Sequence, residues 1–216
     1  MEFIYDPPQA PLRVVHRDAD LLVLDKPSGL LSVPGKPENH RDCLQSRAKT
    51  SYPASLLVHR LDLDTSGVIV FAMNPKAQRH LGLQFERRQT AKTYIARVWG
   101  QVLGECGTVD LPIDIDWPNR PLHHVSHATG RPAQTNWKVI GRDRIATRME
   151  LTPLTGRSHQ LRVHMQALGH PILGDRLYAK GEALEAAERL QLHAASLEFY
   201  HPTGGERLKF ESACPF

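Results

Sequence analysis

A carboxylate and a cation lie two residues apart in the segment 59–67, whose sequence is HRLDLDTSG. Apolar runs at 56–58 and 68–71 flank it, and Thr, Ser and Gly end it, so the pattern predicts a polar loop between two buried stretches. A carboxylate held in such a loop, here Asp62, can serve as a nucleophile or as a general base. By itself an Arg-x-Asp sequence is more often a surface β-turn, and this interpretation stays open here.

A second concentration of polar side chains occupies residues 154–165, whose sequence is LTGRSHQLRVHM. Leu161 begins an apolar stripe at helical spacing, and Arg157 and Arg162 lie at the start and on the flank of the same helix. From composition alone, this is an amphipathic helix with a solvated basic face. Its polar residues are nevertheless too dense for a simple core helix.

The composition indicates a globular protein for which a polyanion is a plausible partner. The 216 residues are 41% hydrophobic, enough for a substantial core, and no linker, repeat or low-complexity tract divides them. We therefore expect a single domain over residues 1–216. The formal charge of +4 and the pI near 9.1 fit a nucleic-acid partner without requiring one.

Cysteine use and hydropathy predict the compartment. Cys43, Cys106 and Cys214 lie far apart, with no CxxC pair, which fits a reducing environment. The N-terminal segment lacks the apolar core of a signal peptide, and no apolar run approaches the ~20 residues of a membrane span. We therefore expect a cytoplasmic protein with no membrane partner.

The local patterns predict more strands than helices. The expected strands are 21–24, 93–99, 108–113, 133–140, 145–152, 195–200 and 207–211. The expected helices begin at Asp42, at Asn74 and at Ser158, and a further helix covers 182–190. Since many strands follow one another directly, the sequence predicts an α+β fold with a mixed, mainly antiparallel sheet and flanking helices.

Four motifs together resemble those of the RluA-type pseudouridine synthases. Segment 59–67 matches HRLDxxTSG, 26–29 matches KPxG, 92–100 matches KxYxAxVxG, and 155–175 contains TGRxHQLRxH followed by LGHPILGD. The motifs also follow the order that the family has. The resemblance implies the family's catalytic fold and its reaction, the isomerisation of uridine in RNA to pseudouridine, with no cofactor and no metal.

The resemblance also implies roles for individual residues. Asp62 is similar to the family's essential catalytic aspartate, Tyr94 to the aromatic residue that stacks on the target uracil, and Arg162 to the arginine that pairs with the aspartate. The hydroxyl of Tyr94 can also assist removal of the proton from ring carbon five. A carboxylate can attack the sugar, attack ring carbon six or remove a ribose proton, so the attacked atom stays open.

The same resemblance places RNA contacts at Arg60, Lys26, Arg157 and Leu161. Arg60 is similar to the arginine that fills the space of the flipped-out nucleotide, since a uridine stacked inside RNA must be extruded before it can react. A structural ion pair between Arg60 and Asp64 is the alternative. Asp64 falls at a variable position of the motif and receives no catalytic role.

Within the family, the chain is most similar to the short members that lack an additional N-terminal RNA-binding domain, because only ~20 residues precede the first expected strand. This similarity implies two substrates, a uridine at position 32 of the tRNA anticodon stem-loop and one at position 746 of 23S rRNA. We also expect a monomer.

Two other functions remain as alternatives. One is a catalytically silent RNA-binding protein on the same scaffold, although the three expected catalytic residues are all present. The other is a metal enzyme built on His123, His124 and His127. Prolines flank this stretch and no acidic residue lies at HExxH spacing, so we expect no metal there. None of the four motifs accounts for these histidines.

Overall fold

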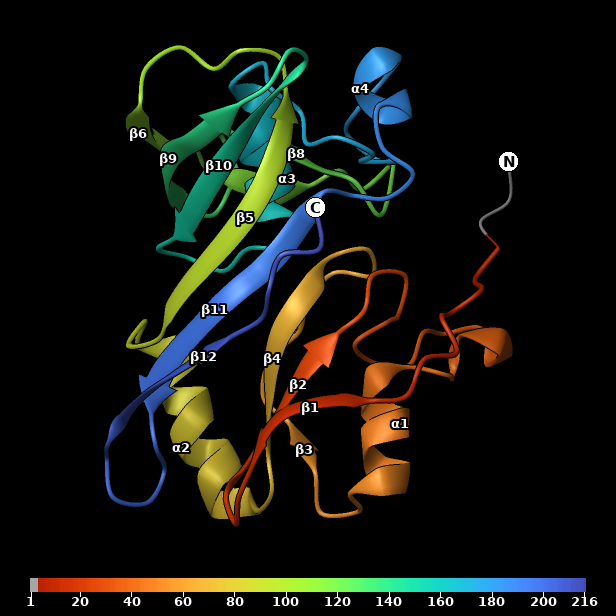
Figure 1. Cartoon of the computed structure of the whole chain (residues 1–216), viewed down its shortest axis with the longest axis vertical. Helices are drawn as coiled ribbons and strands as arrows, with labels where there is room; N and C mark the ends of the chain where they lie inside the picture. Colours follow the sequence, from red (N-terminus) through yellow and green to blue (C-terminus); the bar gives the residue numbers. More distant parts are fainter. Residues whose placement is uncertain (1–3) are drawn as a thin grey trace. The chain divides into compact units, whose positions relative to one another are not determined.

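The computed structural model describes residues 4–216, which form two compact units (Figure 1). The first unit contains the chain up to Ala91 together with Ala194–Pro215, and the second contains Lys92–His193 and Phe216. The chain thus leaves the first unit, completes the second and returns to the first. A single catalytic domain over residues 1–216 stays a prediction, because this division does not test whether the two units act as one.

Mainly antiparallel strand pairs build the first unit. The strand order is β1, β2, β4 and β11, with β12 paired to β11 and β3 paired to β4. Their bounds are β1 (Arg13–Arg17), β2 (Leu21–Lys26), β3 (Leu56–Leu57), β4 (Ser66–Ala72), β11 (Leu192–Tyr200) and β12 (Arg207–Glu211). β2 and β4 are buried along their whole length, which explains why both are almost continuous apolar runs.

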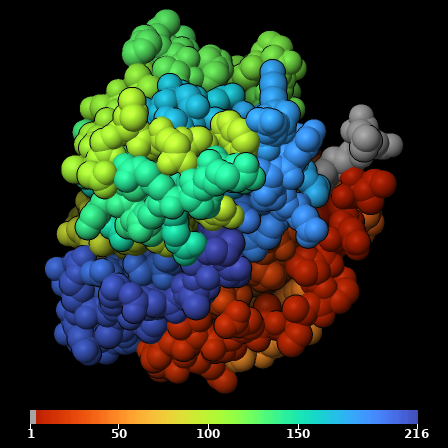
Figure 2. Space-filling view, turned by 45° about the horizontal axis from the view of Figure 1, so that its top comes forward, coloured from red at the N-terminus to blue at the C-terminus, as the bar shows by residue number. Residues whose placement is uncertain are grey.

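A strand from the N-terminal part of the chain and one from its C-terminal part lie side by side in the first unit. Figure 2 shows the N-terminal strand β1 (red) beside the C-terminal strand β12 (blue), and these two strands are in contact. His201, which follows β11, lies 3.3 Å from the carboxylate of Asp18, which follows β1. Residues that are far apart in the sequence therefore close this unit.

Helix α2 (Pro75–Glu86) begins as predicted. The side chain of Asn74 accepts a hydrogen bond from the backbone N–H of Ala77 at 2.9 Å, and Pro75 takes the first helical position. Ala77 and Leu81 are fully buried in the core that β2, β4 and β11 form. The opposite face of α2 is exposed.

Helix α1 (Leu44–Ser51) follows a short 3-10 helix, η1 (Glu38–His40). The prediction that Asp42 begins this helix is wrong. Cys43 is the cap, because its sulfur accepts from the backbone N–H of Ser46 while the Ser46 side chain accepts from the Cys43 backbone. The carboxylate of Asp42 is instead held by the guanidinium of Arg47, with two contacts of 2.7 Å.

The strands of the second unit are also paired antiparallel. Its strand order is β5, β10, β9 and β6, and a two-stranded sheet pairs β7 with β8. The bounds are β5 (Ala91–Trp99), β6 (Cys106–Asp110), β7 (Ile113–Ile115), β8 (His123–Val125), β9 (Gln134–Arg142) and β10 (Ala146–Pro153). Ala96 and Val98 of β5 enter its core with Met149 and Leu151 of β10, so the predicted alternation of β5 is confirmed.

Both helices of the second unit are shorter than predicted. Helix α3 (Gln160–Ala167) begins two residues after the predicted Ser158, because His159 has a left-handed backbone with φ of 56°. Helix α4 (Glu182–Glu185) ends well before residue 190. Leu190 is buried in the core with Leu192 of β11, and the chain must leave the helix to bring it there.

The predicted fold class, α+β with a mainly antiparallel sheet, is confirmed by this architecture. Five strands were not predicted as strands. The sequence indicated β4 only as a buried apolar run. β1 is mostly exposed, β3 has two residues, and β7 and β8 lie in a stretch rich in Pro and His, so these four have no strong apolar period. No helix within residues 4–216 has the length and apolar character that crossing a bilayer requires.

Candidate active site

The loop that carries Asp62 connects β3 to β4 in the first unit, and it is held from outside by the loop that follows β2. Lys26, the last residue of β2, is fully buried. Its ammonium donates to the backbone carbonyls of Pro27 at 2.9 Å, Leu30 at 2.6 Å and Leu63 at 2.8 Å. The backbone N–H of Gly29 also donates to the carbonyl of Leu63. One buried cation therefore ties the two loops together next to Asp62.

The residues on the other side of Asp62 are fixed as well. Ser32, which is 3% exposed, donates its hydroxyl to the carbonyl of Leu61 at 2.6 Å and accepts from the Leu61 backbone N–H at 3.1 Å. The hydroxyl of Ser28 donates to the carbonyl of Asp64 at 2.7 Å. Since neighbours on both sides of the partly exposed Asp62 are anchored, the backbone that carries this carboxylate is held in place.

Close packing explains why the motif ends in small residues. Thr65 and Ser66 are buried, and the backbone N–H of Thr65 donates to the carbonyl of Asp62 at 3.2 Å, closing a turn. Gly67 has φ of +114° and lies so close to Ala194 that an added Cβ would be 2.2 Å from its carbonyl oxygen. Only glycine fits at this position.

Lys26 was predicted to contact RNA, and this assignment needs correction. Its side chain is 0% exposed and its ammonium is directed at three backbone carbonyls, so it presents no surface to a ligand in this structure. A buried ammonium is tolerated only where it is hydrogen-bonded in this way. Lys26 positions the Asp62 loop.

Arg60 is exposed, as a residue that contacts RNA must be. No ion pair joins it to Asp64 in the part of the chain that the structure describes, so the structural alternative raised for Arg60 finds no support. The preceding His59 is held instead. Its ring stacks on Phe85 of α2 with centroids 4.5 Å apart, and its Nε2 accepts from the backbone N–H of Val70 at 3.2 Å.

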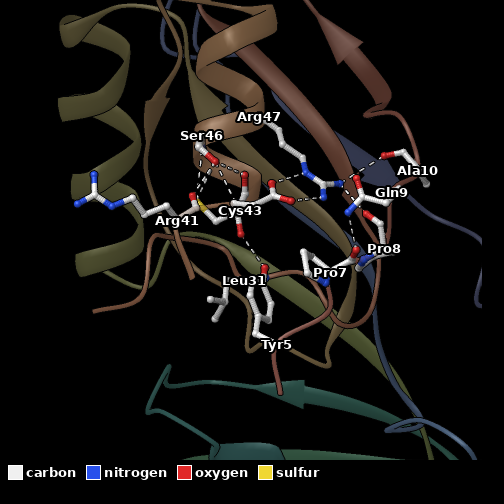
Figure 3. Close-up of polar contacts among 11 residues, drawn as sticks. Tyr5, Pro7, Pro8, Gln9, Ala10, Leu31, Arg41, Cys43, Ser46 and Arg47 are labelled. Atoms are coloured by element: carbon white, nitrogen blue, oxygen red, sulfur yellow. Dashed lines mark hydrogen bonds and ion pairs between the residues drawn. The ribbon is translucent and has the colours of Figure 1, made fainter. Parts of the chain in front are cut away.

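The N-terminal segment supports the loop that holds Asp62, and the sequence did not predict it. The hydroxyl of Tyr5 donates to the carbonyl of Asp42 at 2.7 Å and accepts from the backbone N–H of Leu31 at 3.1 Å (Figure 3). Arg47 binds Asp42 and donates to the carbonyl of Pro8 at 2.7 Å. Leu31 precedes Ser32, so this network reaches the Asp62 loop through one residue. Burial raises the pKa of Tyr5, which therefore stays a neutral phenol.

Tyr94 lies on β5 of the second unit, directly opposite Leu151 of β10. It is partly buried and packs against the core, so its ring is supported from behind. Leu161 of α3 belongs to that same core and is 6% exposed. The prediction that Leu161 contacts RNA is therefore not supported, since its side chain serves packing, as the apolar stripe itself indicated.

Arg162 of α3 is one of the most constrained cations in the second unit. It is 4% exposed, and its Nε and Nη2 bind the two oxygens of the buried Asp175 at 2.7 and 2.6 Å. Its guanidinium also lies 5.0 Å from the ring centroid of Tyr178. The sequence predicted Asp62 as the partner of Arg162 and missed Asp175. The pairing with Asp62 stays a prediction.

Asp175 gains further donors from its own turn. Its Oδ1 accepts the backbone N–H groups of Leu177 at 3.0 Å and Tyr178 at 3.2 Å. The bidentate arginine and the two N–H donors satisfy the charge and the lone pairs of this carboxylate, which burial would otherwise leave unpaired. The LGD sequence of the last motif therefore fixes Arg162.

Tyr178 joins Arg162 to the unexplained histidines. Its hydroxyl accepts from the backbone N–H of His123 at 2.9 Å and lies 2.7 Å from Nδ1 of His159. The rings of His123 and His159 also make an edge contact with centroids 4.9 Å apart. The β7–β8 hairpin is thus attached to α3 through one phenol.

The polar residues at the start of α3 are mostly structural. Gln160 is buried, and its carbonyl accepts from the Thr155 hydroxyl at 2.7 Å and from the Arg157 backbone N–H at 3.0 Å. Arg157 is partly exposed and its Nε donates to the carbonyl of Pro132. His164 is fully buried between the Thr135 hydroxyl and the carbonyl of Leu111, and this burial lowers its pKa.

Within residues 4–216, no three His, Cys, Asp or Glu side chains gather in a way that could hold a metal ion. The ring nitrogen of His123 lies 3.1 Å from the carbonyl of Pro121, and its backbone binds Tyr178. Among the described residues, His123, His124 and His127 therefore do not form a set of ligands for a metal ion.

Known proteins are similar to this chain in sequence and in fold. A family model described as RNA pseudouridylate synthase matches residues 20–167. Proteins named dual-specificity RNA pseudouridine synthase RluA, from Salmonella typhimurium and Escherichia coli, are 52% and 51% identical over 215 residues, 98% of each chain. Human RNA pseudouridylate synthase domain containing 1 has a similar structure, with a TM-score of 0.80 and 28% identity over 98% of this chain and 87% of its own. Human RNA pseudouridylate synthase domain containing 4 has a TM-score of 0.76 and 27% identity over 94% and 88%.

Proposed function

Since this chain belongs to the RNA pseudouridylate synthase family, it is an isomerase that converts uridine in RNA to pseudouridine, and we propose that Asp62 is its catalytic carboxylate. The observation that carries this proposal is the anchoring of the Asp62 loop. Lys26 and Ser32 hold the residues on either side of Asp62, which suits a carboxylate that must meet one atom of the substrate.

The reaction itself needs no external reagent. The bond from the anomeric carbon to ring nitrogen one breaks, the uracil turns, and ring carbon five bonds to the same anomeric carbon. Carbon five then loses its proton while nitrogen one gains one, so atoms and electrons balance within the nucleotide. A carboxylate can assist the first step as a nucleophile or as a base.

Tyr94 and Arg162 act with Asp62 in this proposal. The ring of Tyr94, supported by the core of the second unit, offers a flat apolar face for a flipped uracil. Arg162 is held by Asp175 and by the ring of Tyr178, which supports a role as a rigid cation that orients the catalytic carboxylate. Because this guanidinium is already fixed, orienting Asp62 costs little additional side-chain entropy.

Arg60 fills the space of the extruded nucleotide. Its exposure and the lack of an ion pair with Asp64 among the described residues support this role. A planar guanidinium can stack on the neighbouring bases and contact a phosphate at the same time. Arg157, partly exposed at the start of α3, contributes a further RNA contact.

The substrates are two structured RNAs, the tRNA anticodon stem-loop at position 32 and 23S rRNA at position 746. The support is the name of the relatives, dual-specificity RNA pseudouridine synthase, at about half identity along nearly the whole chain. The enzyme acts as a monomer in the cytoplasm, and residues 1–216 work as one catalytic domain.

A map of pseudouridine in cellular RNA tests the proposal. We compare cells that carry the gene with cells from which it is deleted. The deleted cells are also complemented with either the wild-type protein or Asp62→Asn. Pseudouridine at the two positions should disappear with the gene and return only with the wild-type protein. Full return with Asp62→Asn refutes the catalytic assignment, and loss at other positions alone refutes the proposed substrates.

A further inference from the structure

The exposed face of helix α2 and the residues that follow it carry a local excess of positive charge. Residues 74–90 contain four cationic side chains, Lys76, Arg79, Arg87 and Arg88, and one carboxylate, Glu86. The net charge of this segment is +3, and all four cations are exposed. Helix α2 and its end are therefore locally cationic.

None of these four cations has a carboxylate partner among the described residues. Seven arginines elsewhere in the described chain lie within ion-pair distance of an Asp or Glu. Lys76, Arg79, Arg87 and Arg88 take part in no ion pair within residues 4–216. Unpaired like charges on one face repel one another, a cost that an anionic ligand removes.

The helix presents these cations rigidly. Lys76, Arg79 and His80 line an open depression together with Pro75 and Leu83, all of which belong to α2. Ala77 and Leu81 on the inner side are fully buried in the core, so α2 cannot turn away. At 1.5 Å per residue the twelve residues of α2 extend over about 18 Å.

The cationic face also continues to the catalytic loop within the same unit. Phe85, near the C-terminal end of α2, stacks on His59, which lies three residues before Asp62. Arg60 follows His59 and is exposed. A polyanion that places one nucleotide at Asp62 can therefore extend past Arg60 along α2.

We infer that the outer face of α2 binds the phosphate backbone of the substrate RNA away from the target uridine. Double-helical nucleic acid carries about one charge per 1.7 Å, so a stem along about 18 Å of helix offers on the order of ten phosphates. The face has one exposed large apolar residue, Leu83, which is too little for an amphipathic membrane helix. The inference rests on RNA as the substrate and is independent of which uridine is modified.

Charge reversal on this face tests the inference. The variant is Lys76→Glu with Arg79→Glu, and the matched control is Lys49→Glu with Arg144→Glu, which makes the same charge change at exposed cations outside α2 that have no ion pair. Affinity for a stem-loop RNA is measured across salt concentrations. The α2 variant should bind at least about tenfold more weakly, and its salt slope should fall by about 1.4–1.8 for two lost phosphate contacts.

Turnover separates this surface from the catalytic site. At saturating RNA the α2 variant should keep its rate within about twofold, and a short oligonucleotide around the target uridine should bind it as it binds the wild type, because only remote contacts are lost. Lys76→Gln with Arg79→Gln should show a smaller loss of RNA affinity. This variant replaces the charge-reversal variant if the latter does not fold. Equal weakening in the control variant, or an unchanged salt slope, overturns the inference. So does α2-dependent binding to phosphatidylglycerol vesicles without an effect on RNA.

Discussion

At the scale of single residues, the protein separates side chains that hold the site from side chains that remain exposed to a ligand. Lys26 and Leu161 were both predicted to contact RNA, yet one binds three backbone carbonyls and the other lies in the core. Arg60 is exposed and without an ion pair to Asp64 in the described part of the chain. A motif residue can thus serve either to hold the site or to contact the ligand, and only its surroundings in the structure distinguish these two roles.

Replacement of Arg60 by Ala tests its role at this scale. If Arg60 fills the vacated stack, Arg60→Ala should slow turnover of a stem-loop RNA by more than about tenfold, with little change in melting temperature. An RNA that is already unstacked around the target should lose less, because less stacking has to be replaced. Equal losses on both RNAs together with a destabilised fold would assign Arg60 to loop structure instead.

At the scale of elements, the Asp62 loop and helix α3 are each held by one buried residue that bridges two segments. Lys26 joins the loop after β2 to the loop before β4, and Tyr178 joins the β7–β8 hairpin to Arg162 of α3. Both bridges depend on contacts between residues far apart in the sequence. The function of each element therefore depends on a neighbour that its own sequence pattern does not contain.

Lys26→Met keeps most of the side-chain volume and removes the buried ammonium. Three carbonyls lose a charged donor, which should destabilise the protein by about 2–4 kcal/mol and lower turnover by displacing Asp62. Thermal unfolding and single-turnover rates measure the two effects. Lys36→Met, at an exposed lysine, is the control and should change stability little. A Lys26→Met protein as stable and active as the wild type contradicts the bridging role.

Tyr178 can be divided into its hydroxyl and its ring. Tyr178→Phe loses the bonds to His123 and His159 but keeps the ring beside Arg162, so it should retain most of the turnover rate. Tyr178→Leu loses both and should reduce the rate by about tenfold or more. Single-turnover assays of the two variants, at temperatures where both are folded, decide the matter. Equal rates in Phe and Leu would mean that the ring does not position Arg162.

Sequence patterns predicted helices, strands and residue types better than they predicted which side chains interact with each other. Asn74 and Pro75 were sufficient to place the start of α2, because a helix cap is a local interaction. The start of α1 was misplaced by one residue, since Asp42 is engaged by Arg47 and the N-terminal segment. Asp175 was missed as the partner of Arg162 because thirteen positions separate them and no local rule joins an arginine to that carboxylate.

At the scale of the whole molecule, stability should depend on pH through His164. Burial lowers its pKa below the ordinary value of 6.5, so the unfolded chain takes up the proton first as pH falls. The contribution is complete above about pH 6.5 and declines below it, by at most about 1.4 kcal/mol per pH unit.

Unfolding of the wild type and of His164→Asn between about pH 7.5 and about pH 5.5 measures this effect. The wild type should lose more stability than His164→Asn over this interval, because Asn cannot take up a proton and can still bond to Thr135. An equal loss in both proteins contradicts the assignment of this pH dependence to His164.

The central claim is that an RNA pseudouridine synthase reaction proceeds at Asp62. The most direct measurement is single-turnover formation of pseudouridine in a synthetic anticodon stem-loop by the wild type, Asp62→Asn and Asp64→Asn, with melting temperatures recorded for all three. We predict that Asp62→Asn is folded and retains less than about a tenth of the wild-type rate, because an amide cannot serve as the nucleophile or base, while Asp64→Asn is close to the wild type. A folded Asp62→Asn protein with a tenth of the wild-type rate or more, or a comparable loss in Asp64→Asn, contradicts the claim.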